Sequence, residues 1–479
     1  NMMDNYSSSK SEAYRGFPSE DMSETTYAYE ITGKPSETEA SSRLCGFLGL
    51  LNYTYDYIYL MDLSCRLDGS SEFGVDKKFA PFWSTGLGVN VHNYAFMKEH
   101  VPYIEVLKIR GSYGQTGKVN FPAYSALTTY DIYTQDWYST GYGAIIRYLG
   151  NRNLKWEKTN TWDVGFDFAS FRGALDIKFS YYNKKTVDLV TDVSLPSSSG
   201  FNSYKDNMGE VVNRGIEINV KSMIVNRPDF LLSVFANLAH NKNEILKITD
   251  ELAAYNEKVN DYFNEKVTDR DYSKVITKYE PGGSLTSIFG MRSMGIDPAN
   301  GNELYLKRNG TATYDWDPAE MVIIGNSEPD VQGSFGLNVT YKNFSLYTSF
   351  LYEFGGQRYN YTLVNEVENA DVYNYNVDKR VMSARWQKLG DVTPLKNIKD
   401  RDVTTRATSR FVQDYNVLSL NTLTLGYDFK QEMIRKWGFS MLRLQFNMTD
   451  VARFSTVKQE RGLSYPFART FNVTLNASF

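Results

Sequence analysis

Few segments of this 479-residue chain have the residue types and spacing that catalysis or metal binding requires. The segment GQTG (114–117) has the glycines of a phosphate-binding loop but lacks the lysine and the following helix. The segment DPANGNE (297–303) offers oxygen ligands for calcium, but an Asp-Pro and Asn-Gly turn explains it more simply. His92, His100 and His240 lack metal-ligand spacing. We therefore expect no enzyme active site, no metal and no cofactor.

Aromatic residues in polar segments are the better binding candidates, because a flat ring can stack on a flat ligand while its polar end stays hydrated. The segment TQDWYSTGYG (134–143) is the richest of these, and within it Trp137 and Tyr138 are candidate substrate contacts. Tyr373 and Tyr375 in DVYNYNVD are weaker candidates. All four side chains could equally pack within a loop or contact another protein.

Composition excludes several classes of protein. A net charge of −4 gives no basic surface for nucleic acid. The longest apolar run, LCGFLGLL (44–51), is far shorter than the ~20 residues of a membrane-spanning helix. The first residues are polar, so no signal peptide is visible. Aromatic residues reach 15%, which is high for an ordinary globular chain.

Alternation of apolar and polar residues recurs along the chain and predicts strands. In TWDVGFDF (161–168), Trp162, Val164 and Phe166 share one face, and Asp163 and Asp167 share the other. We expect about thirteen such strands across 43–479. They are joined alternately by short turns and by long polar loops. The short turns are at Asp56, 170–173, 225–229 and 342–343, and the long loops are 117–155, 191–208, 243–332 and 357–416.

The alternation fits two architectures. A soluble sheet points its apolar face inward, whereas a membrane barrel points it to lipid and lines its lumen with the polar face. Regular strand length, aromatic strand ends and long loops on one side favour the barrel. The predicted fold class is therefore all-β, a transmembrane antiparallel β-barrel. Residues predicted to contact lipid are Trp162, Val164, Phe166, Leu175, Ile177, Phe179, Leu442, Leu444 and Phe446.

Several motifs, in a fixed order along the chain, are more specific than the apolar and polar alternation. They are CRLDGSSEFG (65–74), LKIRGSYGQTG (107–117), LKWEKTNTWDVGFDF (154–168), NMGEVVNRGIEINV (207–220), GIDPANG (295–301), YKNFSLYTSFLYEFGG (341–356), RWQKLGD (385–391) and LNTLTLGYDF (420–429). Together they resemble the C-terminal barrel part of SusC/RagA-type TonB-dependent outer-membrane transporters. Two departures, Asp450 and Glu72, affect loop contacts and not the fold.

The resemblance implies a barrel of about 22 strands filled by an N-terminal plug. It also implies a Gram-negative outer membrane, energy from TonB acting on the plug, and a SusD-like surface lipoprotein as lid. The cargo would be a large nutrient, with an oligosaccharide as first candidate and a peptide, as in the RagA branch, as the alternative. A passive porin or a structural barrel is the alternative of another class.

Charged residues on the polar faces should then line the lumen, where most stay hydrated or bond to the plug. These candidates are Asp62, Arg66, Lys108, Arg110, Asp163, Asp167, Glu217, Lys221 and Arg443. At the chain end, Phe471, Val473, Leu475 and Phe479 alternate with polar residues and should face lipid. The resemblance implies that the terminal aromatic is read by the outer-membrane assembly machinery.

Strand directions counted back from the C-terminus predict that residues 1–42 belong to an extracellular loop segment and 43–479 to the barrel. About thirteen strands leave about nine to be supplied, since open edges in lipid are not viable. We expect a second chain that carries the plug and the N-terminal strands, and that pairs with 43–55 and 469–479.

The two cysteines, Cys45 and Cys65, lie on the strands that flank the turn at Asp56. If the turn centres on Asp56, the two residues are diagonal neighbours ~7–8 Å apart at Cα. That separation is beyond the reach of an unstrained disulfide, so two free thiols are predicted.

Overall fold

The computed structural model describes residues 1–73, 78–118, 126–139, 141–151, 154–194, 203–207, 209–249, 253–257, 259–260, 275, 278–374, 376–399, 404–458 and 469–479. Side chains within strands are described except at 34–35, 133–138, 142, 191–194, 203–204 and 206. Tyr375 lies outside the described residues, and the side chains of Trp137 and Tyr138 are not described.

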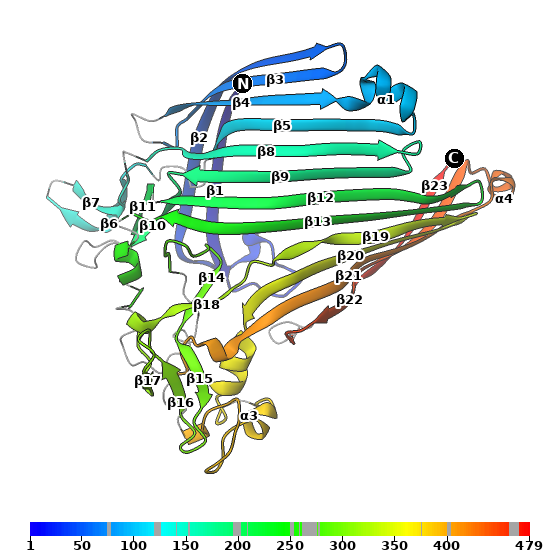
Figure 1. Cartoon of the computed structure of the whole chain (residues 1–479). Helices are drawn as coiled ribbons and strands as arrows, with labels where there is room; N and C mark the ends of the chain where they lie inside the picture. Colours follow the sequence, from blue (N-terminus) through cyan, green and yellow to red (C-terminus); the bar gives the residue numbers. More distant parts are fainter. Residues whose placement is uncertain are drawn as a thin grey trace.

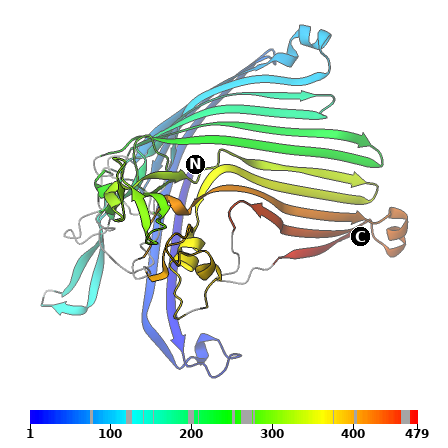
Figure 2. The ribbon, with the colours of Figure 1, turned by 60° about the horizontal axis from the view of Figure 1, so that its bottom comes forward.

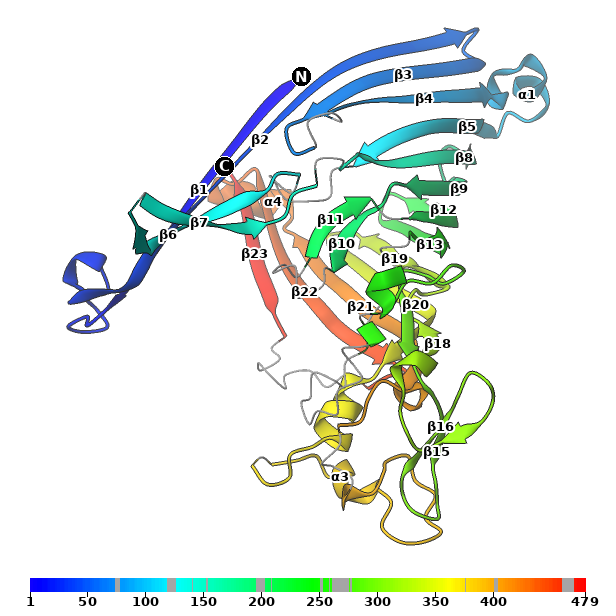
Figure 3. The same ribbon diagram turned by 90° about the vertical axis from the view of Figure 1, so that its left-hand side faces the viewer.

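One antiparallel sheet of 14 strands dominates the molecule (Figure 1). Its strands pair in the order in which they occur along the chain, and β1 and β23 form its two edges. Figures 2 and 3 show it strongly curved, like part of a barrel wall. Its strands are β1 (Met2–Arg15), β2 (Glu30–Tyr55), β3 (Tyr59–Ser70), β4 (Phe79–Asn90), β5 (Ile104–Lys118), β8 (Glu157–Ser170), β9 (Leu175–Val187), β12 (Glu210–Arg227), β13 (Phe230–Lys247), β19 (Val331–Tyr341), β20 (Phe344–Tyr359), β21 (Val412–Asp428), β22 (Met441–Ser455) and β23 (Phe471–Ser478).

Short connections gather at one end of the sheet and long ones at the other, as the sequence predicts (Figure 1). The short end carries η3 (Val91–Asn93), α1 (Ala95–His100), α4 (Gln431–Ile434) and η10 (Arg435–Trp437). The long connections contain structure of their own and do not run as plain polar loops. Their elements are β6 (Thr129–Tyr138), β7 (Gly141–Tyr148), β10 (Val190–Ser194), β11 (Ser203–Asn207), β14 (Ser287–Gly290), β15 (Arg292–Ile296), β16 (Glu303–Leu306), β17 (Ala312–Thr313), η6 (Pro318–Glu320), β18 (Val322–Asn326), η7 (Leu363–Glu368), α3 (Arg380–Ser383) and η9 (Ser409–Phe411).

Residues 1–42 differ from the prediction of a loop. β1 pairs with the first half of β2 from Met2 opposite Cys45 to Arg15 opposite Glu30, and η1 (Thr25–Tyr27) lies in the connection between them. This hairpin projects from the body of the sheet (Figure 3). Serine, threonine and glutamate fill both of its faces, so the apolar alternation that reveals the other strands is missing. Its extracellular position remains a prediction.

The turn between β2 and β3 is displaced from its predicted centre by one residue. Tyr55 pairs with Tyr59, and both Asp56 and Tyr57 have positive φ angles, as in the tight hairpin turns that match strand twist. Cys45 therefore lies opposite Gly69 and not opposite Leu67. The two cysteines are four residues apart along the ladder, roughly 14 Å, so the predicted diagonal contact is wrong. Both are free thiols.

The apolar face is exposed, as predicted for contact with lipid. Trp162, Val164 and Phe166 on β8 are 38%, 50% and 38% exposed. Leu442 is the exception at 8%, which contradicts its predicted exposure. Helix α4 contacts β22, and Ile434 on that helix is only 1% exposed. The connection from β21 to β22 therefore shields the start of β22, which alternation alone could not indicate.

Buried apolar residues gather at the loop end. One cluster includes Phe73, Phe82 and Trp156. The larger cluster joins two long connections, and we call the described residues of 284–326 and 359–411 the loop cap. Its core is Ile288, Tyr359, Val364, Val367, Ala370, Val381, Leu395 and Phe411.

The first prediction tests the assignment of faces. Phe166 stacks on Phe179 of β9 with ring centroids 5.4 Å apart. Phe166→Arg should lower the free energy of unfolding in lipid by ~2–4 kcal/mol if this position lies near the bilayer midplane. The measurement is reversible unfolding in bilayers. The matched control is Lys178→Arg on the opposite face, with an expected change near zero. Equal stability of both variants would refute the assignment.

Candidate functional site

All nine predicted lumen residues lie on one face of the sheet. The strand register connects them without a break, from Asn52 opposite Asp62 on β2 and β3 to Asp428 opposite Arg443 on β21 and β22. Successive pairs across the sheet carry this face through every strand between them. The displaced turn changes the pairing of β2 with β3 by two residues, and a change of two leaves the face assignment as predicted.

Arg110 of β5 is the centre of the best-connected group on this polar face. Its guanidinium donates to Asp163 at 2.8 Å and to the Ser180 hydroxyl at 2.7 Å, and lies 3.6 Å from Asp167. Three neighbouring strands, β5, β8 and β9, therefore share one cation. Lys108 lies directly opposite Asp167, which places a second cation beside the group.

The remaining candidates have simpler surroundings on the same face. Arg66 pairs with Asp68 at 2.5 Å, and Asp62 lies opposite Gly86. Glu217 lies opposite Ser180, and Lys221 lies opposite Asp176. Arg443 donates to the Ser345 hydroxyl at 3.0 Å and lies 3.7 Å from Asp428. Their role toward a plug remains a proposal.

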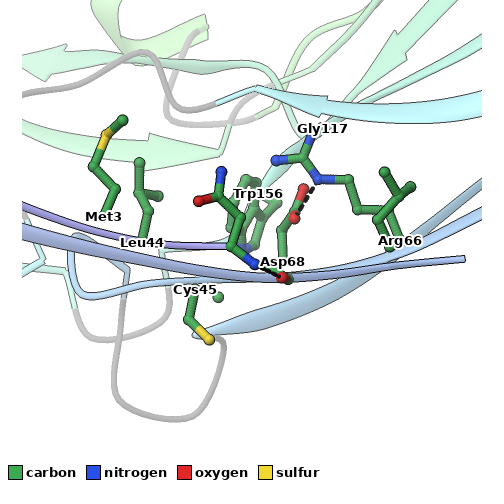
Figure 4. Close-up of a pocket in the computed structure, with 11 residues that line it drawn as sticks. Met3, Leu44, Cys45, Arg66, Asp68, Gly117 and Trp156 are labelled. Atoms are coloured by element: carbon green, nitrogen blue, oxygen red, sulfur yellow. Dashed lines mark hydrogen bonds and ion pairs between the residues drawn. The ribbon is translucent and has the colours of Figure 1, made fainter.

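A cavity of about 450 Å³ opens on the polar face near the loop end (Figure 4). Leu44, Arg66, Asp68 and Trp156 are among its lining residues, and the Cys45 side chain points away from it. Trp156 stacks on Phe73 at 4.2 Å between ring centroids. The sequence did not indicate this pocket, because its residues come from four strands, β1, β2, β3 and β5, and from the segment before β8.

Gly117 explains the GQTG segment. It lies within β5, so the segment ends a strand and is not a phosphate loop, as predicted. A β-carbon at Gly117 would lie 2.0 Å from the ring of Phe82, so only glycine fits beneath this aromatic cluster.

The loop cap is held together by a buried ionic triad. Arg410 lies 2.7 Å from Glu303 and 2.7 Å from Glu368, and the three side chains are 8%, 3% and 0% exposed. The Thr408 hydroxyl donates to Glu303 at 2.8 Å. Glu303 belongs to the first of the two cap segments, and Glu368 and Arg410 belong to the second. The triad therefore ties the two cap segments together, and Arg410 lies 107 residues after Glu303 along the chain.

The electrostatics of the triad favour the ionised forms of Glu303 and Arg410. Burial alone raises the pKa of the Glu303 carboxyl, but Arg410 and hydrogen bonds from Ser293 and Thr408 lower it by more. Burial lowers the pKa of Arg410, yet the two carboxylates raise it above its usual value. Burial and the neighbouring Glu303 raise the pKa of Tyr305, whose hydroxyl donates to Glu303.

A second buried arginine, Arg385, bonds to the backbone of the cap. Its guanidinium donates to the carbonyls of Val381, Lys396, Val367 and Glu368 at 2.7–3.2 Å. These carbonyls come from η7, α3 and the segment after it, so one side chain supports three irregular stretches. Sequence reasoning considered Glu303 only as part of the 297–303 turn, and it missed the roles of Arg385, Arg410 and Glu368. No periodicity marks such long-range contacts.

The predicted aromatic contacts do not form one site. Trp137 and Tyr138 lie on β6, opposite Tyr142 and Gly141 of β7. The β6–β7 hairpin projects from the loop end, well separated from the region of α3 in all three views. Tyr373 lies in the loop cap and is 78% exposed. Trp137 and Tyr138 therefore lie on a different loop from Tyr373.

The segment 297–303 is a turn, as predicted. The Gly301 amide donates to the Asp297 carbonyl, and Gly301 has a φ of 76°. A hydrogen bond from the Tyr314 hydroxyl and one from the Ala299 amide lower the pKa of Asp297. Within the described ranges, no group of three or more His, Cys, Asp or Glu side chains could hold a metal ion.

Among the described residues, the structure has no helix that is both long and apolar enough to cross a membrane.

A curved antiparallel sheet with one apolar exposed face, one charged face, and short turns opposite long folded loops defines the wall of an outer-membrane β-barrel. The chain belongs to the family described as "TonB dependent receptor-like, beta-barrel", which matches residues 4–451. The resemblance seen in the sequence is thereby confirmed, as are the fold class and the outer-membrane location.

The names of similar proteins are consistent with this family assignment. TonB-dependent receptor P3 of Formosa agariphila is 29% identical over 485 residues, covering 94% of this chain and 47% of the relative. TonB-dependent receptor SusC of Bacteroides thetaiotaomicron is 27% identical, covering 91% and 44%. The structure of the RagAB peptide transporter aligns with a TM-score of 0.77 at 21% identity, covering 95% and 49%. The chain thus spans about half the length of the curated relatives it matches.

The second prediction concerns the triad. Arg410→Met leaves two carboxylates buried without a partner and should destabilise the loop cap by ~3–5 kcal/mol. Hydrogen exchange of the cap amides measures this as a loss of protection. Arg380→Met is the matched control, because its partner Asp378 lies at the surface, where a pair is worth ~0–1 kcal/mol. Replacing all three triad residues by apolar ones should restore protection. Unchanged protection in Arg410→Met would contradict the role of the triad.

The third prediction is a loss of cap stability in acid. The folded pKa of Glu303 lies below its unfolded value, which is near 4.3. Glu303 therefore stabilises the cap fully above the unfolded value, and this stability is lost as pH falls through the folded pKa. Exchange protection factors, corrected for intrinsic rates, should fall over that range. Glu303→Gln should flatten this pH dependence, and an equally steep dependence in the variant would rule the explanation out.

Proposed function

We propose that this chain contributes the wall and the folded loops of a TonB-dependent importer for a large nutrient, with an oligosaccharide as its cargo. The partners in this proposal are a SusD-like surface lipoprotein at the loop end and TonB, which acts through a plug inside the barrel. The family match and the SusC relative support import across the outer membrane. The chain's part in import is binding and passage, with no covalent chemistry.

The loop cap is the observation that carries this proposal. It is folded around its own apolar core and tied by the Arg410 triad, so its outer surface is preformed. A preformed surface lowers the entropic cost of binding a ligand or a lid protein. A passive pore has no need for such a structure at its mouth.

The polar face fits a plugged lumen. Arg110 and Lys108 balance the charges of Asp163 and Asp167 within the wall, so these residues can bond to a plug without leaving a bare charge. The open edges of the sheet support the proposal of further strands. Residues 47–55 of β2 and all of β23 are paired on one side only among the described residues. Unpaired backbone in lipid costs several kcal/mol per group, so further strands of the transporter must pair with both.

Exposed aromatic rings on the loops support a flat, hydroxyl-rich ligand. Tyr373 in the cap and Tyr130 on the β6–β7 hairpin are both exposed. An aromatic face and a polar tip suit a sugar ring, which presents both apolar and hydroxyl surfaces. A peptide could use the same rings, so the experiment below includes both classes of ligand.

The fourth prediction tests import in cells that carry the complete transporter. Uptake of fluorescent oligosaccharides should require TonB. Trp137→Ala combined with Tyr138→Ala should weaken uptake about tenfold, since two aromatic contacts at ~0.5–1.5 kcal/mol each sum to about one factor of ten or more. The matched control is Tyr57→Ala, an exposed tyrosine in a short turn at the opposite end.

Other outcomes of this experiment would indicate a different function, cargo or binding surface. Uptake that continues without TonB would indicate a passive porin. TonB-dependent uptake of peptides but not of oligosaccharides would indicate the peptide alternative. An equal effect of the loop variant and the Tyr57 control would remove Trp137 and Tyr138 from the binding surface.

A further inference from the structure

A groove of about 430 Å³ lies on the apolar face of the sheet, across β19, β20, β21 and β22. This volume falls within the roughly 300–1,000 Å³ of small-molecule sites. Nearly all of its lining is apolar, and the lining residues include Val339, Tyr341, Leu346, Leu425 and Phe446.

The strand register places these side chains on the lipid-facing side. Val339 pairs with Leu346, Leu346 pairs with Leu425, and Leu425 pairs with Phe446. Phe446 in turn lies opposite Val473 in the exposed apolar row of β23. The groove is therefore continuous with the surface that contacts hydrocarbon, and it is separate from the charged polar face.

Two short connections meet at the end of this groove. One is the tight turn at Lys342 and Asn343, and the other runs from Phe429 to Ser440. The Asn343 side chain donates to the Asp428 carbonyl at 2.6 Å, and the Asp428 amide donates to the Asn343 carbonyl at 2.9 Å. These bonds fix the two connections side by side at the short-turn end of the barrel.

This end carries an excess of positive charge. Lys342, Lys430, Arg435 and Lys436 are all exposed, and Glu432 is the single acidic residue between 429 and 440. In the part of the chain that the structure describes, none of the four cations forms an ion pair. The Lys342 ammonium lies 5.5 Å from the centre of the Tyr341 ring, which holds it beside the groove.

The second connection also has the character of an interfacial segment. Ile434 is buried, whereas Met433 and Trp437 are exposed. Tryptophan beside basic residues is typical of the level of the lipid headgroups, where an aromatic ring and a cation both find favourable surroundings. The charged connections should therefore lie at headgroup depth, and the groove should extend from them into the hydrocarbon.

We propose that this groove binds one anionic phospholipid of the periplasmic leaflet. An acyl chain lies along Val339, Leu346 and Leu425, and the phosphate lies between Lys342 and Lys430. Arg435 and Lys436 add to the local positive potential, which attracts anionic lipid. This site takes no part in import of the substrate, and it stands whatever the cargo is.

The fifth prediction tests the site on the complete purified transporter in detergent, by native mass spectrometry with added phosphatidylglycerol or phosphatidylcholine. Phosphatidylglycerol should bind at least about tenfold more tightly, and added salt should weaken that preference by screening. Lys342→Gln combined with Lys430→Gln should reduce its affinity to that of phosphatidylcholine. Lys342→Arg with Lys430→Arg should keep the preference, because the charge is retained.

Two further variants keep the proposal falsifiable. Lys98→Gln with Arg172→Gln removes two cations from other short connections and should leave binding unchanged. Val339→Phe fills the groove on its lipid-facing side and should weaken binding of long-chain but not of short-chain phosphatidylglycerol. Equal affinity for both lipids, or an unchanged preference in the Lys342 and Lys430 double variant, would overturn the proposal. A loss of the same size in the Lys98 and Arg172 control would show a general charge effect and overturn it as well.

Discussion

Backbone hydrogen bonding in a solvent that offers no partners is the constraint on which this structure depends. Within hydrocarbon every amide and carbonyl must be paired by the protein itself. The 14-stranded ladder does this by joining each strand to the next along the chain. A membrane crossing needs only about 9–11 residues per strand, yet β12 and β13 have 18 each. The excess length extends the ladder beyond the bilayer at one or both ends, and rigid strand ends there support folded loops.

In this ladder successive side chains of a strand point to opposite faces, so one face of the wall is apolar and the other is polar. Apolar rows on alternate residues contact lipid, and the same strands present Arg110, Asp163 and Asp167 on the other side. A charge on the polar face is stable because neighbouring strands supply its partner within hydrogen-bond distance. The wall thus needs no separate core, and its buried apolar clusters form where the loops fold over its end.

The difference between the regular wall and the folded loops explains which features could be predicted from the sequence. Alternation revealed the strands of the large sheet within 43–479, their faces and most of their turns, since each of these signals lies within ~10 residues. It failed for β1, whose serine and glutamate residues fill both faces, and for Leu442, which is shielded by a helix from the adjoining connection. It also failed for the loop cap. Glu303 and Arg410 are 107 residues apart, and nothing in either local segment indicates the other. Trp137 and Tyr138 were chosen by residue type alone and remain a prediction, because alternation says nothing about how a loop is placed.

Charged side chains have opposite environments at the two ends of the barrel wall. In the loop cap, Arg410, Glu303 and Glu368 are withdrawn from water, and each has an ion-pair partner at 2.7 Å. At the short-turn end, Lys342 and Lys430 stay exposed without an acidic partner among the described residues. A buried triad is stable only in one arrangement, so it makes the cap a single body whose two segments must move together. Exposed cations beside an apolar groove can instead interact with a ligand that binds there. The charged residues of the cap therefore stabilise the fold of the cap itself, whereas in our proposal those of the short-turn end bind lipid of the surrounding membrane.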